Sequence, residues 1–169
     1  RYPEHAVSFD AARGEIIGLA GLVGAGRSEI AKAIVGLDAG GSSEVYLGDQ
    51  CIEVRRPRDA IAHGIYLVPE NRRTEGLVVE MSICENISLR SLRRFARAGL
   101  IDSEQERETA RAQMSALQIK APATASLVRN LSGGNQQKVV LGKWLSMQPK
   151  VMILDEPTRG IDVGAKAEI

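Results

Sequence analysis

The chain has 169 residues, of which 44% are hydrophobic and 25% charged, and its formal net charge at pH 7 is +1. This length suits one globular domain, and the near-neutral charge gives no electrostatic argument for binding nucleic acid or a membrane surface. No apolar run approaches the roughly 20 residues that span a bilayer, and the start at Arg1 has no signal-peptide pattern. Cys51 and Cys84 lack the spacing of a metal site, so we expect reduced, buried thiols in a cytosolic protein.

A glycine-rich loop over residues 21–28 follows an apolar, strand-like run over residues 15–20 and leads into a helical pattern. Glycines let successive backbone N–H groups approach phosphate oxygens, and the following helix adds its positive N-terminal end. The phosphate-loop pattern G-x-x-x-x-G-K-[ST] has lysine where this chain has Arg27. A tight strand–helix turn without a ligand is the alternative. The loop residues that we expect at the nucleotide-binding site are Gly21, Gly24, Ala25, Gly26, Arg27, Ser28 and Glu29.

The segments around this loop predict short, regular elements. Residues 6–9 alternate like the end of an edge strand, and Arg13-Gly14 predicts a turn before the strand at 15–20. Apolar residues recur at helical spacing from Ser28 to Val35, with Gly36 as the C-cap. The next elements are a flexible connection at 40–43, a hairpin over 44–54 with its turn at 48–49, a short helix over 57–62 that Gly64 ends, and a buried strand over 65–68.

Residues 77–130 are expected to form a helical insertion between two parts of an α/β core, which would comprise residues 1–76 and 131–169. A charged loop at 70–76 precedes the insertion, and a linker at 121–126 follows it. Ser82 with Glu85, and Ser103 with Glu106, have the spacing of capping boxes. The second helix carries a narrow apolar stripe, which suits packing on a small satellite core. That stripe consists of Ala110, Met114 and Leu117.

The return to the core runs through residues 131–138 into a helix that Pro149 ends, followed by a predicted buried strand at 151–154. Residues 158–169 predict a loop and the beginning of another helix. The strand runs into Asp155-Glu156, the arrangement that a nucleotide-hydrolysing site requires beside a phosphate loop. We expect Asp155 and the Ser28 hydroxyl to hold Mg²⁺, and Glu156 to orient or polarise the attacking water as the catalytic residue. Two solvated acids at a strand end are the alternative. The buried face of the helix is predicted to carry Val140, Leu141, Trp144 and Leu145.

Residues 131–137, Leu-Ser-Gly-Gly-Asn-Gln-Gln, are similar to the signature sequence of ATP-binding-cassette (ABC) proteins. Ser132 can N-cap the following helix, and Gly133 and Gly134 let another molecule's phosphates approach its amides. An ordinary capped helix is the alternative. In that family the signature faces the γ-phosphate held by the opposing domain, which implies that one copy cannot complete a site. The resemblance implies nucleotide contacts for Ser132, Gly133, Gly134, Asn135 and Gln136.

The chain as a whole resembles one half of the duplicated ATPase subunit of bacterial monosaccharide importers for ribose, galactose and xylose. Four passages carry the resemblance, at residues 21–29, 68–72, 131–138 and 155–164. Arg27-Ser28-Glu29, and Glu70 in place of the usual glutamine, resemble the second, C-terminal cassette of those subunits. Residues 160–162 stand at the family's loop across the dimer interface, so Asp162 joins Glu70 among the expected nucleotide-binding residues.

This resemblance implies a P-loop (RecA-like) α/β ATPase core with an inserted helical subdomain, and ATP and Mg²⁺ as cofactors. The implied partners are the N-terminal cassette of the same subunit, a transmembrane permease contacted through residues 70–76 and the insertion, and indirectly a periplasmic sugar-binding protein. The implied location is the cytoplasmic face of the inner membrane. The family's switch histidine has no counterpart here, because His5 and His63 both lie upstream of Asp155. We expect that histidine, the adenine-stacking aromatic residue and the last core strands to lie outside this chain.

Three departures from the family pattern predict weak or altered nucleotide binding by the chain's own loop. Arg27 replaces a compact ammonium by a planar fork and could pair with Glu29 or Asp155. Glu29 competes with nucleotide for the positive end of the helix, and Glu70 offers no donor when ionised. We therefore expect a poor site in cis and an intact signature that completes a better site on a partner cassette. A regulatory module in which ATP binding only drives docking, and a soluble cassette unrelated to transport, are the alternatives.

Overall fold

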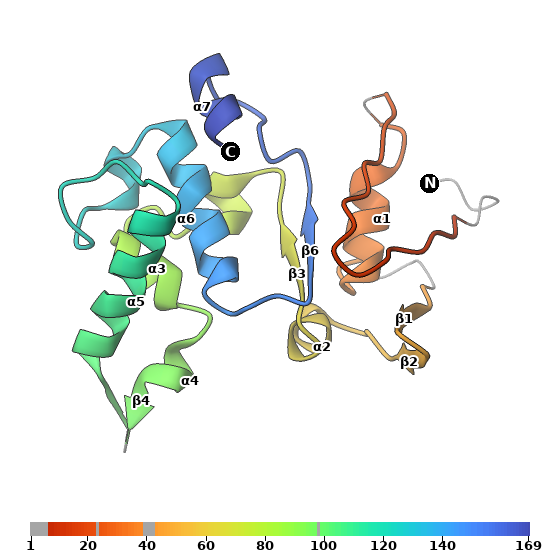
Figure 1. Ribbon diagram of the computed structural model, residues 1–169, viewed down its shortest axis with the longest axis horizontal. Helices are drawn as coiled ribbons and strands as arrows, with labels where there is room; N and C mark the ends of the chain where they lie inside the picture. Colours follow the sequence, from red (N-terminus) through yellow and green to blue (C-terminus); the bar gives the residue numbers. More distant parts are fainter. Residues whose placement is uncertain (1–6, 23, 39–42, 98) are drawn as a thin grey trace.

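The computed structural model describes residues 7–22, 24–38, 43–97 and 99–169 (Figure 1). In chain order the elements are α1 (Arg27–Ile34), β1 (Val45–Leu47), β2 (Gln50–Ile52), α2 (Pro57–Ala62), β3 (Ile65–Val68), the wide helical turn η1 (Arg72–Gly76), α3 (Ile83–Ser88), α4 (Leu92–Phe95), β4 (Ala96–Arg97), β5 (Leu100–Ile101), α5 (Ser103–Ala116), the 3₁₀ turn η2 (Val128–Asn130), α6 (Gly133–Leu145), β6 (Val151–Leu154) and α7 (Val163–Glu168). None of the helices in the described ranges is long and apolar enough to cross a membrane.

The parallel pair β3–β6 lies between α1 on one side and the group of helices around α6 on the other (Figure 1). Its register runs from Ile65 opposite Val151 to Val68 opposite Leu154. The prediction of a buried strand is confirmed for β3 but wrong for β6, where Val151 is 38% and Leu154 47% exposed. The reason is that β3 is the only strand in the described ranges that pairs with β6, so its second edge carries no strand.

The strand predicted at residues 15–20 is not formed. Residues 7–22 contain neither helix nor strand and pass beside α1 as an exposed segment, in which Ile16 is 97% exposed (Figure 1). The expected edge strand is likewise absent over residues 7–9, and Ala6 lies outside the described residues. An apolar run becomes a strand only with a hydrogen-bonded neighbour. Within the described ranges no strand pairs with this run. The turn at Arg13-Gly14 is confirmed, with Gly14 at φ 80°.

A small core joins the end of α1 to the hairpin β1–β2, to α2 and to β3. The hairpin and the helix over 57–62 are confirmed at the predicted places. Gly36 follows the helix end at φ 71°, and a Cβ there would lie 2.7 Å from the backbone N of Arg56. The connection predicted at 40–43 falls largely outside the described residues. The buried members of this core are Val35, Ile52, Ala60 and Ile65.

A larger core lies where α3 and α5 pack against α6. The predicted stripe of α5 is confirmed: Ala110 is fully buried, and Met114 and Leu117 pack against the cluster. On α6, Val140 is buried and Leu141 and Trp144 pack against the same core, but Leu145 is 38% exposed because it ends the helix. The fully buried side chains of this core are Ile83, Ile87, Ala110, Val128, Val139 and Val140, together with Val68 of β3.

Capping patterns in the sequence predicted the first residues of the helices in this core, with one error. Ser82 and Glu85 form the predicted capping box of α3. At α5 the N-cap is Asp102, whose carboxylate accepts from the amides of Glu104 and Gln105, so the box predicted for Ser103 and Glu106 is wrong. The Glu106 carboxylate instead accepts a hydrogen bond from Ser88 of α3. It thereby joins two helices.

The two thiols differ in their surroundings. Cys84 is buried in the larger core, and burial raises its pKa to about 11, which keeps the thiol protonated at neutral pH. Cys51 lies on the exposed face of β2, so the expectation of two buried cysteines is wrong for it. The hairpin has one covered face only, and residue 51 points to the other.

Lys143 is an unusual member of the α6 interior. Its side chain is 7% exposed, and its ammonium donates a hydrogen bond to the carbonyl of Gly76. Desolvation lowers its pKa from 10.5 to about 8. The buried charge is therefore a cost to the folded state at neutral pH, while the hydrogen bond ties the end of η1 to the last turn of α6.

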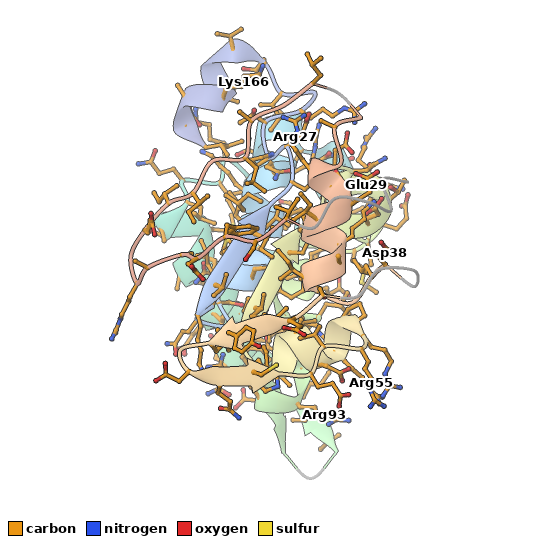
Figure 2. All side chains as sticks on the ribbon, turned by 90° about the vertical axis from the view of Figure 1, so that its right-hand side faces the viewer. Arg27, Glu29, Asp38, Arg55, Arg93 and Lys166 are labelled. Atoms are coloured by element: carbon orange, nitrogen blue, oxygen red, sulfur yellow. The ribbon has the colours of Figure 1, made fainter. Side chains whose placement is uncertain are left out.

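Lys143 gives the free energy of unfolding a specific pH dependence. Its folded pKa lies below its unfolded value, so between about pH 8 and 10.5 the unfolded chain binds more protons, and stability rises with pH. The slope contributed by one such group is at most ~1.4 kcal/mol per pH unit. We expect urea titrations to show this rise in the wild type relative to Lys143→Met. The exposed Lys166 provides the control, because Lys166→Met should keep the wild-type slope (Figure 2).

Candidate functional site

The glycine-rich loop turns directly into α1. Gly24 and Gly26 have φ of 83° and 90°, values that side chains disfavour, and the Ala25 amide donates to the Leu22 carbonyl at 3.0 Å. Gly26 is the N-cap of α1 and supplies no side-chain acceptor, so the amides of the first turn are not capped by a side chain. This geometry suits anion binding at a helix N-terminus. Residue 23 lies outside the described residues.

The structure brings the two residues after Gly26 against the two carboxylates at the end of β6. Arg27 Nη2 donates to Glu156 Oε1 at 2.8 Å, and Ser28 Oγ donates to Asp155 Oδ1 at 2.9 Å. Arg27 therefore pairs with neither of its expected partners, Glu29 or Asp155. Glu29 lies at the same end of α1 and is exposed (Figure 2). Glu156 is the preferred partner because β6 delivers it beside the first turn of α1.

Asp155 sits at the centre of this group and is 7% exposed. Its amide donates to the Val68 carbonyl at 2.9 Å and so extends the β3–β6 ladder by one bond. Its Oδ2 is buried without a hydrogen-bond partner, which is costly for a carboxylate and suits a cation. The described residues contain no cluster of three or more histidine, cysteine or acidic side chains that could hold a metal ion. A hydroxyl and one carboxylate nevertheless fit Mg²⁺, which takes its remaining ligands from water and phosphate.

Glu156 has a strained backbone at φ 43°, in the left-handed region. Its side chain is 40% exposed and its carboxylate is bonded to Arg27, whose side chain is 30% exposed. The carboxylate therefore lies beside the first residue of α1, and the Arg27 guanidinium already holds one of its oxygens. Both ions contact solvent, so the pair is worth only about 0.2–1 kcal/mol and can open.

The signature segment begins α6 as predicted. Ser132 is its N-cap and is exposed, and its Oγ accepts from the Asn135 amide at 3.4 Å and from Asn135 Nδ2 at 3.0 Å. Asn135 Oδ1 in turn accepts from the Lys120 amide at 2.8 Å. Gln136 is buried, and its Nε2 donates to the Val128 and Leu131 carbonyls at 3.1 and 3.2 Å. Gln136 therefore fixes the segment that leads into α6. Its side-chain amide nitrogen bonds to backbone carbonyls of this chain and not to a ligand.

Both signature glycines lie against other parts of this chain. A Cβ on Gly133 would lie 2.7 Å from Arg72 Nη2, and one on Gly134 would lie 2.6 Å from Ala165 Cβ of α7. Internal packing therefore requires glycine at residue 134, whereas at residue 133 an added Cβ would displace the end of the Arg72 side chain. Figure 1 shows α7 beside the N-terminal end of α6, where Lys138 Nζ and Glu168 Oε2 form an ion pair at 2.7 Å.

The loop after β3 is tied to the loop after β6. Glu70 forms an ion pair with Arg159, so its expected nucleotide contact would require that pair to open. Arg72 Nη1 donates to the Arg159 carbonyl at 2.9 Å and Nη2 to the Gly160 carbonyl at 3.3 Å. Asp162 N-caps α7 by accepting from the Ala165 amide at 2.9 Å. Sequence reasoning missed Arg72 and Arg159, because their partners are distant in the chain.

A shallow pocket of about 250 Å³ lies at the signature. It opens between the start of α6 and α7, and the expected nucleotide-binding residues that line it are Ser132, Gly134, Asn135 and Asp162. The loop before α1 instead contacts Asp155 and Glu156, and Glu70 contacts Arg159. The polar side chains lining the pocket are those of Lys120, Ser132, Asn135, Asp162 and Glu168.

The two contacts between α1 and the end of β6 should differ in their effect on stability. Among the residues that the structure describes, Ser28 is the one hydrogen-bond donor to the buried Asp155 side chain, so we expect Ser28→Ala to cost about 1–3 kcal/mol. Arg27→Ala opens a partly exposed pair and should cost about 1 kcal/mol or less. Urea unfolding of both variants, with the exposed Glu29→Ala as control, measures the difference. Equal losses for Ser28→Ala and Glu29→Ala would contradict the assignment.

Known proteins were compared with the chain by sequence and by structure. Curated relatives include a "Putative ribose/galactose/methyl galactoside import ATP-binding protein 1" of Rhizobium etli, 55% identical over 96% of this chain and 31% of the relative. They also include a "Ribose import ATP-binding protein RbsA 2" of Streptomyces avermitilis, 54% identical over 96% of this chain and 32% of the relative. The chain thus spans about a third of the length of these relatives.

Solved structures match the fold. The ATP-binding cassette MJ0796, in a dimeric post-hydrolysis state bound to ADP and Pi, superposes with a TM-score of 0.75 over 95% of this chain and 68% of that one, at 22% identity. A nucleotide-free cassette of an ABC transporter superposes with a TM-score of 0.67 over 86% of this chain and 59% of that one, at 23% identity. These likenesses confirm the predicted α/β fold of a P-loop ATPase cassette. The family described as ABC transporter matches residues 5–159, and the chain belongs to the ABC transporter family.

Proposed function

We propose that this chain is the second, C-terminal nucleotide-binding cassette of a bacterial monosaccharide importer and couples ATP binding and hydrolysis to sugar uptake. The names of its relatives support a sugar importer, since they describe import ATP-binding proteins for ribose and galactose. Arg27-Ser28-Glu29 and Glu70 support the second cassette. The relatives' greater length leaves room for another cassette, so the partner in this proposal is the N-terminal cassette of the same subunit.

Within this cassette we assign the phosphates of ATP to the amides at the start of α1. Ser28 and Asp155 would hold Mg²⁺, which would neutralise the phosphate charge, and Glu156 would orient water. The unpartnered buried Oδ2 of Asp155 supports a cation at that point. Gly21, Ala25 and Gly26 shape the loop, and its positive end attracts phosphate.

The observation that carries the proposal is the ion pair between Arg27 Nη2 and Glu156 Oε1 at 2.8 Å. The group that should bind phosphate and the group that should orient water are bonded to each other. ATP must separate them before either can act, which predicts a weak site in cis. Ser132 at the start of α6 is exposed, and its Oγ accepts two hydrogen bonds from Asn135, so its hydroxyl can still donate to a phosphate on the opposing cassette.

The remaining parts of the proposal concern assembly. Residues 1–76 and 131–169 would form the ATPase core and residues 77–130 the helical subdomain. Residues 70–76 and the insertion would contact a transmembrane permease, and a periplasmic binding protein would deliver the sugar. The cassette would then lie on the cytoplasmic face of the inner membrane. Asp162 would reach the dimer interface from the loop before α7.

Nucleotide titration tests the weak site. We expect this chain to bind ATP with a dissociation constant far above 1 µM, with or without Mg²⁺, and to hydrolyse it slowly. Glu29 competes for the positive end of α1, Glu70 offers no donor when ionised, and binding must also open the Arg27–Glu156 pair, which by itself costs only about 0.2–1 kcal/mol. Calorimetry and phosphate release measure the two quantities. Asp155→Asn should abolish any tightening by Mg²⁺. Submicromolar affinity with fast turnover would overturn the proposal.

A regulatory module without catalysis is the second candidate, and the same ion pair favours it, because a guanidinium on Glu156 opposes catalysis. Arg27→Lys in the full-length subunit separates the two. If the loop limits chemistry in this half, lysine should raise ATP hydrolysis by roughly tenfold or more, and a further Glu156→Gln should remove the gain. Arg55→Lys, on an exposed side chain outside the residues assigned to nucleotide or permease, is the matched control. An unchanged rate with Arg27→Lys would favour the regulatory module.

A further inference from the structure

The guanidinium of Arg72 lies where three distant segments meet. It extends from η1, donates to the carbonyls of Arg159 and Gly160 at 2.9 and 3.3 Å, and lies against the backbone of Gly133. A Cβ on Gly133 would lie 2.7 Å from Arg72 Nη2 and 3.4 Å from the Gly160 carbonyl oxygen. The loop after β3, the signature and the loop after β6 are therefore in contact through one side chain.

The same loops are connected a second time on the side of the candidate catalytic residue. Glu70 forms an ion pair with Arg159, and the Arg159 amide donates to the Glu156 carbonyl at 3.0 Å. Arg72 thus holds the backbone of a turn that begins at Glu156. A shift of Arg72 would move this turn, because the turn's two carbonyls have the guanidinium as their common donor.

Stability alone is a poor explanation for this arrangement. The donors of Arg72 face neutral carbonyls, its Nε is buried without a partner, and within the described residues no carboxylate forms an ion pair with it. Desolvation lowers its pKa accordingly. A partly buried guanidinium without a counter-ion is costly, and an apolar side chain would fill the same space at less cost. What a planar, forked donor adds is geometry: it fixes two carbonyls relative to its own plane.

We propose that Arg72 is a positioning residue that holds the signature glycine Gly133 at a fixed distance from the Arg159-Gly160 turn. The signature and the loop after Glu156 then move as one unit when a nucleotide on another cassette contacts Ser132. The expected effect on nucleotide binding rests on the proposed function. The contact between Arg72 and Gly133 does not rest on it, so the contact and the effect on nucleotide binding can be tested separately.

A double-mutant cycle tests the contact without nucleotide. Gly133→Ala should lower the melting temperature of the wild type, because its Cβ displaces Arg72, and roughly half of that loss or more should vanish in an Arg72→Ala background. Gly142→Ala is the control on the same helix, since its Cβ would meet Leu117 and Gln113 and its cost should be equal in both backgrounds. If Arg72→Ala does not fold, Arg72→Met keeps the stem and serves instead. Equal costs of Gly133→Ala in both backgrounds would overturn the contact.

Hydrogen exchange tests the turn. Arg72→Ala should speed amide exchange over residues 159–161 by roughly tenfold, while the matched Arg73→Ala, on an exposed neighbour, leaves it unchanged. Arg72→Lys should fall between the two, because an ammonium cannot hold both carbonyls in one plane. Exchange that stays at the wild-type rate in Arg72→Ala would overturn the positioning role.

Comparing the effect of Arg72→Ala on two nucleotide sites, the one completed by Ser132 and the one at this chain's own loop, tests the functional consequence. In the full-length subunit Arg72→Ala should raise the KM for ATP roughly tenfold, whereas the ATP affinity of this chain's own loop should change by about fivefold or less, because the Arg27–Glu156 pair beside the turn is worth only about 0.2–1 kcal/mol. A purely structural defect would weaken both. An unchanged KM would overturn the coupling to nucleotide, and a wild-type subunit without ATP hydrolysis would overturn the proposed function while leaving the double-mutant cycle valid.

Discussion

The parallel pairing of β3 with β6 is the constraint on which the candidate site depends. Strands that run in the same direction end at the same edge, so the residues after Val68 and those after Leu154 are brought together. The bond from the Asp155 amide to the Val68 carbonyl extends this pairing into the site. The contacts among Glu70, Arg72, Arg159 and Gly160 depend on that register, because the two loops that carry these residues start from the strand ends that it aligns.

The charges at this edge are arranged in pairs that satisfy one another. Arg27 meets Glu156, Arg159 meets Glu70, and Arg72 meets two carbonyls, so the positive side chains that could bind phosphate already have acceptors. Asp155 is different, since one buried oxygen has no partner. In water-exposed pairs the interaction is weak, so the phosphates of a nucleotide can compete with it, whereas the buried carboxylate creates a lasting preference for a cation.

Local signals in the sequence predicted local structure well. The hairpin, α2 and the caps at Ser82 and Ser132 depend on neighbours within a few residues, and all are found. The strand at 15–20 and the burial of β6 were wrong because both depend on what lies alongside, which a single stretch of sequence does not contain. The Asp102 cap was missed because aspartate and serine were adjacent and both can cap.

For the candidate site, too, the sequence predicted some contacts and missed others. Residue types and spacing were enough to place Ser28, Asp155 and Glu156 in one cluster, since a phosphate loop requires acids beside it. They could not identify the partner of Arg27 among three nearby acids, because that choice depends on the angle at which β6 ends. Nor could they show that Arg72 lies beside Gly133 and that Ala165 lies beside Gly134. These residues are far apart in the sequence, and no sequence pattern marks such contacts.

The central claim is that this cassette contributes more through its signature than through its own loop. The direct measurement is ATP hydrolysis by the full-length subunit carrying either Ser132→Asp or Glu156→Gln. Aspartate retains the N-cap of α6 but places a negative charge where a phosphate would approach, and glutamine preserves the size of Glu156. The account predicts that Ser132→Asp removes most of the activity and that Glu156→Gln leaves most of it. The reverse order would contradict it.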